Sequence, residues 1–165
     1  DISFSSNALA SALGFNGAKV IPAAFKTEEF PFVSDENHPG EYSHHLVILD
    51  HAPVELVRPL IAAARERKIP LKFLGDDQAY AAEKAWNDPN VEFIGQHCEA
   101  TTAALTHGAR AVWALGRSPF PAAALGAQCC GRPVVVTNDS TNHEFLGTDG
   151  VWYVKGESEI SGLLD

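Results

Sequence analysis

The 165-residue sequence has no methionine, only 3 cysteines and few positive charges. Its 12 lysines and arginines stand against 21 aspartates and glutamates, which gives a net charge of −9. Recognition of nucleic acid depends on a basic surface, so this charge balance argues against nucleic acid as a partner. The sequence also lacks an apolar run of about 20 residues and a signal-peptide pattern. We therefore expect no membrane span and a cytoplasmic location.

Cysteine and histidine, the common metal ligands, are too scattered in this sequence to predict a metal site. Cys98 and the adjacent Cys129 and Cys130 do not have the spacing of a zinc motif. Cytosolic proteins rarely form disulfides, so we expect these cysteines to be small, buried apolar residues. The absence of methionine and the aspartate at residue 1 lead us to expect a domain of a longer protein.

Short apolar runs alternate with helical patterns along the chain, which predicts an α/β fold. Strands are expected at 46–49, 71–74, 91–95, 111–115, 134–136 and 150–154, and helices at 53–68, 78–86, 99–107, from 122 to 130, and at 158–164. This alternation is typical of a Rossmann-like parallel sheet with helices on both faces. The length suits one domain over residues 1–165. We divide it into an entry segment, 1–45, with a helix at 5–14, a strand at 19–22 and an irregular loop at 23–43, an α/β core, 46–155, and a terminal helix, 156–165.

The segment from Arg117 to Thr137, RSPFPAAALGAQCCGRPVVVT, carries the most information about function. Pro119 and Pro121 suit the first turn of a helix, alanines follow, and Gly131 suits its end. The apolar run 134–136 is typical of a buried strand in a parallel sheet. A helix that starts at the rim of such a sheet offers N–H groups and the positive end of its dipole, which favour a bound phosphate.

This segment resembles the donor-binding helix of the retaining, GT-B-fold glycosyltransferases of the group-one family. The matching residues are Phe120, Leu125, Ala127, Gly131, Pro133, Val134, Val135 and Thr137. The two glutamates of the family motif are replaced by Ser118 and Gly126. In the family, the first glutamate holds the donor sugar and the second holds the ribose hydroxyls. The entry segment is also similar, through Ser6, Leu9, Leu13, Gly14, Val20, Ile21, Pro22 and Phe30.

The resemblance implies that the chain is one half of a GT-B fold. Its donor substrate would be a nucleotide-diphosphate sugar, with no other cofactor and no metal. The acceptor would be held by an N-terminal GT-B domain that this sequence does not contain. The donor-binding residues implied are Gly75, Asp76, Gly95, Gln96, His97, Arg117, Ser118, Phe120, Ala122 and Glu144.

The resemblance also implies roles for some of these residues. The loop 95–97 would hold the nucleotide base through backbone groups. The N–H groups of Phe120 and Ala122 would face the diphosphate, together with the Ser118 hydroxyl. The Arg117 guanidinium would add positive charge there.

Glu144 matches a family glutamate that follows a polar loop, here 138–142. It would either orient this loop near the donor or begin a helix, where an acidic residue is favourable.

Family members carry a basic pair after the first core strand, and this sequence has no counterpart for it. The corresponding positions hold Ala52, Val54 or Glu55, and Arg58 lies about one turn further along. Because these cations and both glutamates are missing, no catalytic residue is assigned. The first hypothesis is a donor-binding domain of a glycosyltransferase. The alternative is a degenerate glycosyltransferase-like domain that serves in binding or assembly.

Overall fold

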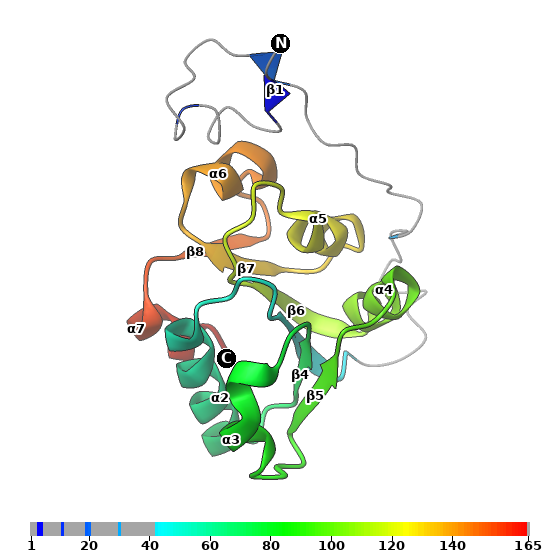
Figure 1. Ribbon diagram of the computed structural model, residues 1–165, viewed down its shortest axis with the longest axis vertical. Coiled ribbons are helices and arrows are strands. Elements are labelled where there is room, and N and C mark those ends of the chain that lie inside the picture. Colours follow the sequence, from blue (N-terminus) through cyan, green and yellow to red (C-terminus); the bar gives the residue numbers. More distant parts are fainter. Residues whose placement is uncertain (1–2, 5–10, 12–18, 21–29, 31–41, 165) are drawn as a thin grey trace.

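The computed structural model describes residues 3–4, 11, 19–20, 30 and 42–164 (Figure 1). Its centre is a six-stranded parallel sheet with the strand order β5-β4-β3-β6-β7-β8. The strands are β3 (His44–Ile48), β4 (Leu71–Leu74), β5 (Val91–Gly95), β6 (Ala109–Ala114), β7 (Val134–Thr137) and β8 (Val151–Val154). In the entry segment, β1 (Ser3–Phe4) pairs in parallel with β2 (Lys19–Val20). The helix expected at 5–14 lies outside the described residues except for Ser11, which is helical.

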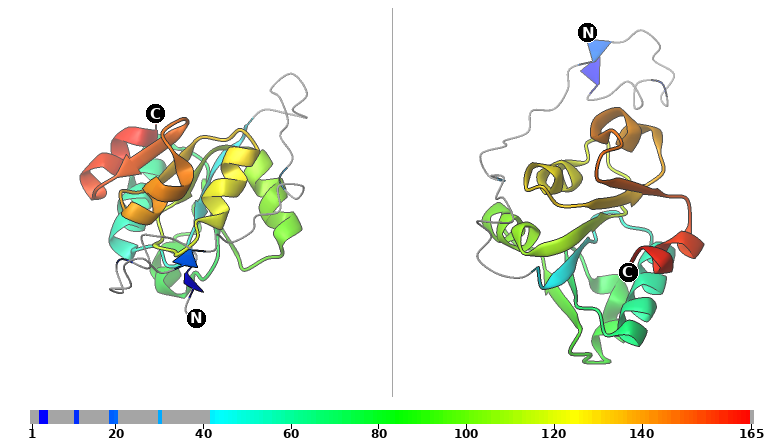
Figure 2. Two further views of the ribbon diagram at one scale, coloured as in Figure 1. Left: turned by 90° about the horizontal axis from the view of Figure 1, so that it is seen from above. Right: turned by 180° about the vertical axis from the view of Figure 1, so that it is seen from behind.

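Helices cover both faces of this sheet (Figures 1 and 2). One face carries α2 (Val54–Arg67), η3 (Gln78–Tyr80), α3 (Ala81–Lys84), α7 (Glu157–Ile160) and η4 (Ser161–Leu164). The other face carries α4 (Glu99–His107), α5 (Ala122–Cys129) and α6 (Ser140–Leu146). In the part of the chain that the structure describes, no helix is both long enough and apolar enough to cross a bilayer.

The apolar run on β3 and just after it explains why the sheet is covered on both sides. Successive side chains of a strand point to opposite faces. Val47 and Leu49 pack in the cluster under α2, whereas Leu46 and Ile48 pack in the cluster under α5. All of them are buried, so no polar residue is needed at alternate positions. The predicted Rossmann-like parallel sheet with helices on both faces is confirmed.

The segment after β7 differs from its prediction. The sequence predicts a polar loop over 138–142, but α6 already begins at Ser140. Asp139 caps this helix, because its Oδ1 accepts a hydrogen bond from the backbone N–H of Asn142 at 2.9 Å. Glu144 therefore lies in the second turn of α6, and the interpretation that it begins a helix is wrong.

A buried hydrogen bond joins the two central strands. The indole N–H of Trp113 on β6 donates to Nδ1 of His45 on β3 at 3.1 Å, and both side chains are buried. This bond needs an imidazole that is unprotonated at Nδ1. Burial lowers the pKa of His45 from its ordinary 6.5 to about 4, with smaller contributions from the positive charges of Arg110 and His44. The native fold therefore holds His45 in its neutral form.

The loops after the central strands touch each other at the carboxyl edge of the sheet. The chain runs from β3 outward to β4 and β5 and then returns to the other side of β3 at β6, so the strand order reverses between β3 and β6. A Cβ atom at Gly116, after β6, would lie 1.9 Å from the carbonyl oxygen of Asp50, after β3. Only glycine permits this approach of the two backbones.

Protonation of His45 should make the fold sensitive to acid. The unfolded chain takes up this proton near pH 6.5, whereas the folded chain resists it until a pH of about 4. The stabilisation contributed by neutral His45 is therefore fully present above the pKa of this group in the unfolded chain. It is lost as the pH falls toward the pKa in the folded chain. Between about pH 7 and about pH 5 the loss from this group is about 2 kcal/mol. Urea unfolding of wild type and His45→Gln measures it. The variant should lose less stability than wild type over this pH range. Some loss remains in the variant, because burial also lowers the pKa of His44. Equal losses in the two proteins would contradict the prediction.

Substitution of Gly116 by alanine should separate the loops after β3 and β6. The methyl group would meet backbone atoms of Asp50, which cannot rotate away as a side chain can. We expect Gly116→Ala to lower the free energy of unfolding by about 2 kcal/mol or more. Gly162→Ala is the matched control, because a Cβ at Gly162 meets no atom within 4 Å. Thermal or urea unfolding compares the two variants, and similar small effects for both would refute the proposed contact.

Candidate functional site

The carboxyl ends of β3, β4 and β5 meet around Asp50. A Cβ at Gly75, after β4, would lie 2.8 Å from Oδ1 of Asp50, and Gly75 has a φ of +121°, which side chains rarely adopt. The Gly75 N–H donates to the carbonyl oxygen of Gly95 at 3.0 Å. Asp76 is exposed beside Gly75, and its Oδ1 accepts the N–H of Gln78 at 3.0 Å, which closes the turn into η3. The structure thus brings together Gly75, Asp76 and Gly95 of the predicted site.

The loop after β5 is accessible at the rim of this edge. The side chains of Gln96 and His97 are exposed. His97 Nε2 lies 3.0 Å from the carbonyl oxygen of Ile94, to which it donates a hydrogen bond. Cys98 follows as the N-cap residue of α4, and hydrogen bonds from Thr101 lower the pKa of its exposed thiol. The residues predicted to hold a base therefore lie beside Gly75, in reach of a ligand on this edge.

The loop between β6 and α5 satisfies its own hydrogen-bonding groups. The Ser118 hydroxyl donates to the carbonyl oxygen of Phe120 at 2.8 Å and accepts the Phe120 N–H at 3.3 Å. The Ala122 N–H donates to the same carbonyl at 2.9 Å. The two N–H groups predicted to face a diphosphate thus already have partners in this loop. A bound phosphate would have to replace these bonds.

Phe30 of the entry segment packs on α5 at Gly126, the position that the sequence resemblance aligns with the second glutamate of the family motif. A Cβ at Gly126 would lie 2.9 Å from Cε1 of the Phe30 ring and 3.0 Å from its Cδ1. Phe30 is buried in a cluster with Ala103 of α4 and with Cys130. The packed ring explains why position 126 is a glycine, because even a methyl group would collide with the aromatic ring.

The cations at this edge do not include Arg58, which is the cation nearest in sequence to the positions where family members carry a basic pair. Nε of Arg58 lies 2.8 Å from Oε1 of the buried Glu83, so Arg58 ties α2 to α3. Arg117, after β6, and Lys155, after β8, are exposed instead at the rim of a pocket. The positive charges at the carboxyl edge therefore follow β6 and β8, which lie on the opposite side of β3 from β4 and β5.

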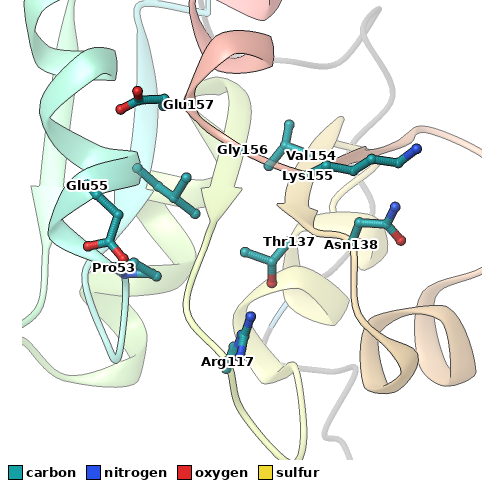
Figure 3. Close-up of a pocket in the computed structure, with 10 residues that line it drawn as sticks. Pro53, Glu55, Arg117, Thr137, Asn138, Val154, Lys155, Gly156 and Glu157 are labelled. Carbon is teal, nitrogen blue, oxygen red and sulfur yellow. The ribbon is translucent and has the colours of Figure 1, made fainter.

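This pocket has a volume of about 470 Å³ and lies between the start of α2 and the loops after β6, β7 and β8 (Figure 3). Its lining residues are Pro53, Glu55, Leu56, Arg117, Thr137, Asn138, Val154, Lys155, Gly156 and Glu157. Figure 3 shows Arg117 extending toward Thr137, with Glu55 on the α2 side and Glu157 at the start of α7. The side chains of Lys155 and Glu157 extend away from the pocket in this view, so Arg117 is the labelled cation that is directed toward Thr137.

The wall formed by the loop after β7 is held by a hydrogen-bond network. The Thr137 hydroxyl donates to Oδ2 of Asp139 at 2.8 Å, and Nδ2 of Asn142 donates to the carbonyl oxygen of Thr137 at 2.9 Å. Nε2 of His143 and Oδ1 of Asn138 are 2.7 Å apart. With the ring N–H donating to this oxygen, the amide NH₂ group of Asn138 remains as a donor. The network therefore fixes the loop that carries Asn138.

The sequence did not single out the acidic and amide groups of this pocket. Open parallel sheets bind ligands beyond the carboxyl ends of their strands, and the loop after β8 at this edge supplies Lys155 and Glu157. Applying the same rule to the predicted strand 150–154 would have found both. Glu144 is exposed on α6 and does not line the pocket.

The fold and this edge can be compared with solved structures. Alr3699/HepE from Anabaena, crystallised in complex with UDP and glucose, aligns with a TM-score of 0.74 and 17% identity over 98% of this chain and 51% of its own. Sucrose-phosphate synthase from Thermosynechococcus elongatus aligns with a TM-score of 0.71 and 17% identity over 97% of this chain and 47% of its own. AviGT4, a glycosyltransferase involved in avilamycin A biosynthesis, aligns with a TM-score of 0.69 and 20% identity over 98% of this chain and 53% of its own.

The chain spans about half the length of these structures. They establish the fold, which is that of one half of a GT-B glycosyltransferase. No protein of curated function matches the sequence. The family model described as "Glycosyl transferases group 1" matches residues 49–162, which is more than half of the chain. The chain therefore belongs to the group 1 glycosyltransferase family.

Proposed function

We propose that this domain binds a nucleoside-diphosphate sugar at the carboxyl edge of its sheet, as the donor-binding half of a glycosyltransferase. The observation that carries the proposal is the meeting of the loops after β3, β4 and β6 at Asp50. Open parallel sheets bind their ligands beyond the strand ends, where the strand order reverses. The same edge carries Arg117 and the accessible loop after β5. Family membership and the similarity to a structure holding UDP-glucose support this ligand class.

Within this proposal the parts of the donor lie along the edge. The base lies at Gly95, Gln96 and His97, next to Gly75. The diphosphate lies between these glycines and Arg117, whose guanidinium offers paired N–H donors to phosphate oxygens. The acceptor lies on a second domain, and the sequence resemblance implies retention of configuration at the transferred carbon. Product analysis with the two-domain enzyme tests that stereochemistry.

The alternative, a degenerate domain used for binding or assembly, is favoured by the region around α5. Ser118 and Gly126 stand in place of the family glutamates, and the ring of Phe30 lies against Gly126. The N–H groups of Phe120 and Ala122 are engaged within their loop. A domain with these features and no nucleotide affinity would have kept the scaffold without its donor chemistry.

A nucleotide titration decides between the two proposals. We expect UDP or GDP to cause saturable NMR shifts of backbone amides in the segments 95–99 and 117–125. Arg117→Gln should weaken binding about tenfold, because a hydrogen bond to a charged group is lost. Arg67→Gln removes the same charge at the far, C-terminal end of α2 and should change the affinity by less than about twofold. Absence of shifts at millimolar nucleotide would favour the alternative.

The packing of Phe30 on Gly126 should determine whether Gly126→Ala lowers or raises the free energy of unfolding. With Phe30 present, Gly126→Ala should lower the free energy of unfolding by about 1 kcal/mol or more, because overpacking exceeds the gain in helix propensity. With Phe30→Ala, the same substitution should raise it by about 0.5–1 kcal/mol, since only the propensity gain remains. Urea unfolding of the four proteins in this cycle gives the coupling. Equal effects in both backgrounds would show that the ring does not occupy this space.

The same cycle determines how the family glutamates should be restored. Gly126→Glu alone would place its Cβ against the Phe30 ring. The informative protein therefore combines Ser118→Glu, Gly126→Glu and Phe30→Ala, with Phe30→Ala alone as its control. Higher affinity for UDP-glucose than in the control would indicate that the pocket for the donor survives. No gain would support the degenerate alternative.

A further inference from the structure

The two outer strands of the main sheet differ in how well their free edges are protected. β5 and β8 stand at the ends of the strand order, so each pairs with a neighbour on one side only (Figure 1). An unpaired edge can bind a further strand, and charged side chains and bulges usually prevent this. β5 carries the exposed Glu92, and its register against β4 shifts between Phe73 and Leu74. β8 has the uncharged sequence VWYV, without proline, and its register against β7 is continuous.

The backbone groups on the free edge of β8 belong to Val151 and Tyr153. Successive residues of a strand direct their N–H and C=O groups alternately to its two sides. The carbonyl oxygens of Gly150 and Val154 accept hydrogen bonds from β7 and from the residue after it, at 2.9 Å each. Val151 and Tyr153 therefore direct theirs away from β7. On that side the described part of the chain supplies no further strand.

Trp152 makes this edge unusually apolar. Its side chain shares a face of the sheet with that of Val154 and is 44% exposed. On the other face, the Tyr153 ring stacks on the His143 ring of α6, with centroids 4.0 Å apart, and its hydroxyl donates to the carbonyl oxygen of Gly147. The strand is thus held in place from one face and presents a large apolar side chain on the other.

We propose that β8 pairs in an antiparallel manner with β8 of a second copy of this chain, so that one sheet runs through both copies. The two copies are then related by a two-fold axis perpendicular to the sheet, and the residue at the axis lies opposite its own counterpart. Two registers overlap the four residues of β8 most fully. One has Trp152 at the axis, and the other has Tyr153.

The backbone favours the register with Trp152 at the axis. There, Val151 of each copy lies opposite Tyr153 of the other, and the two residues exchange a pair of hydrogen bonds through their outward N–H and C=O groups. With Tyr153 at the axis, Val151 would lie opposite Lys155, whose N–H already donates to Oε2 of Glu159 at 3.0 Å. The favoured register also sets the two indole rings side by side, which stabilises a cross-strand pair.

Charges at the two ends of β8 favour the same register. Asp149 lies in the turn before the strand and Lys155 directly after it, and both side chains are exposed. With Trp152 at the axis, Lys155 of one copy lies beside the turn of the other and reaches Asp149 with its long side chain. The other register would bring Asp149 toward Glu157, and the two carboxylates would repel each other. The edge is therefore complementary to itself, which identifies the partner as a second copy.

This interface goes beyond the proposed function and does not depend on it. Antiparallel strands direct their carboxyl ends in opposite directions. The two carboxyl edges of the dimer therefore lie at opposite ends of the shared sheet, and neither is covered by the partner's strands.

An exchange of the two charges tests the dimer and its register. Sedimentation velocity is measured at protein concentrations up to about 1 mM, because small interfaces associate weakly. This chain should show a monomer–dimer equilibrium. Lys155→Glu and Asp149→Lys should each weaken it about tenfold, since the symmetric dimer loses both ion pairs and gains two like-charge contacts. The double exchange Asp149→Lys, Lys155→Glu restores opposite charges and should return the dissociation constant to within about twofold of wild type.

Lys68→Glu is the matched control. Lys68 is an exposed lysine at the C-terminal end of α2, and its substitution changes the net charge as Lys155→Glu does. It should change the dissociation constant by less than about twofold. The two single variants move the net charge in opposite directions, so a general effect of charge cannot weaken both. A chain that stays monomeric at the highest concentration, or single variants that the double exchange does not rescue, would overturn the proposal.

Discussion

Asp50 lies between two glycines, Gly75 of the loop after β4 and Gly116 of the loop after β6. The backbone of Gly116 approaches the carbonyl oxygen of Asp50 so closely that no side chain fits between them. This approach draws the loops after β3 and β6 together at the point where the strand order reverses. Arg117 follows directly, so its position depends on the same contact. The buried bond between Trp113 and His45 holds the strands beneath these loops.

The carboxyl edge has two sides with different chemistry. On the α5 side, the loop before the helix uses its own hydroxyl and N–H groups, and Phe30 fills the space beside Gly126. On the α2 side, charged residues of both signs line a pocket, and none of them forms an ion pair with another described residue. Of the charged residues that line the pocket, Glu55 and Glu157 belong to α2 and α7, on the face of the sheet opposite to α5.

The fold could be predicted from the sequence because its signals are local. The run Leu46–Leu49 is apolar at every position, which indicates burial on both faces, and α2 and β5 fall where their patterns place them. The site could be predicted only in part. Gly75 and Gly95 follow from the rule for strand ends, but the contact of Phe30 with Gly126 joins residues far apart in the chain. Asp139 is a residue type that favours a helix N-cap, but the polar run 138–142 predicts a loop, and the start of α6 at Ser140 is therefore missed.

The contact of Phe30 with α5 also bears on where this domain begins. All six strands of the main sheet lie within residues 44–154, so the sheet alone would place the boundary just before β3. A fragment cut there would keep its topology but uncover an apolar patch that includes Ala103, Gly126 and Cys130. Exposed patches of this kind promote association with other chains. Among the described residues, the packed unit therefore extends beyond the main sheet and includes Phe30.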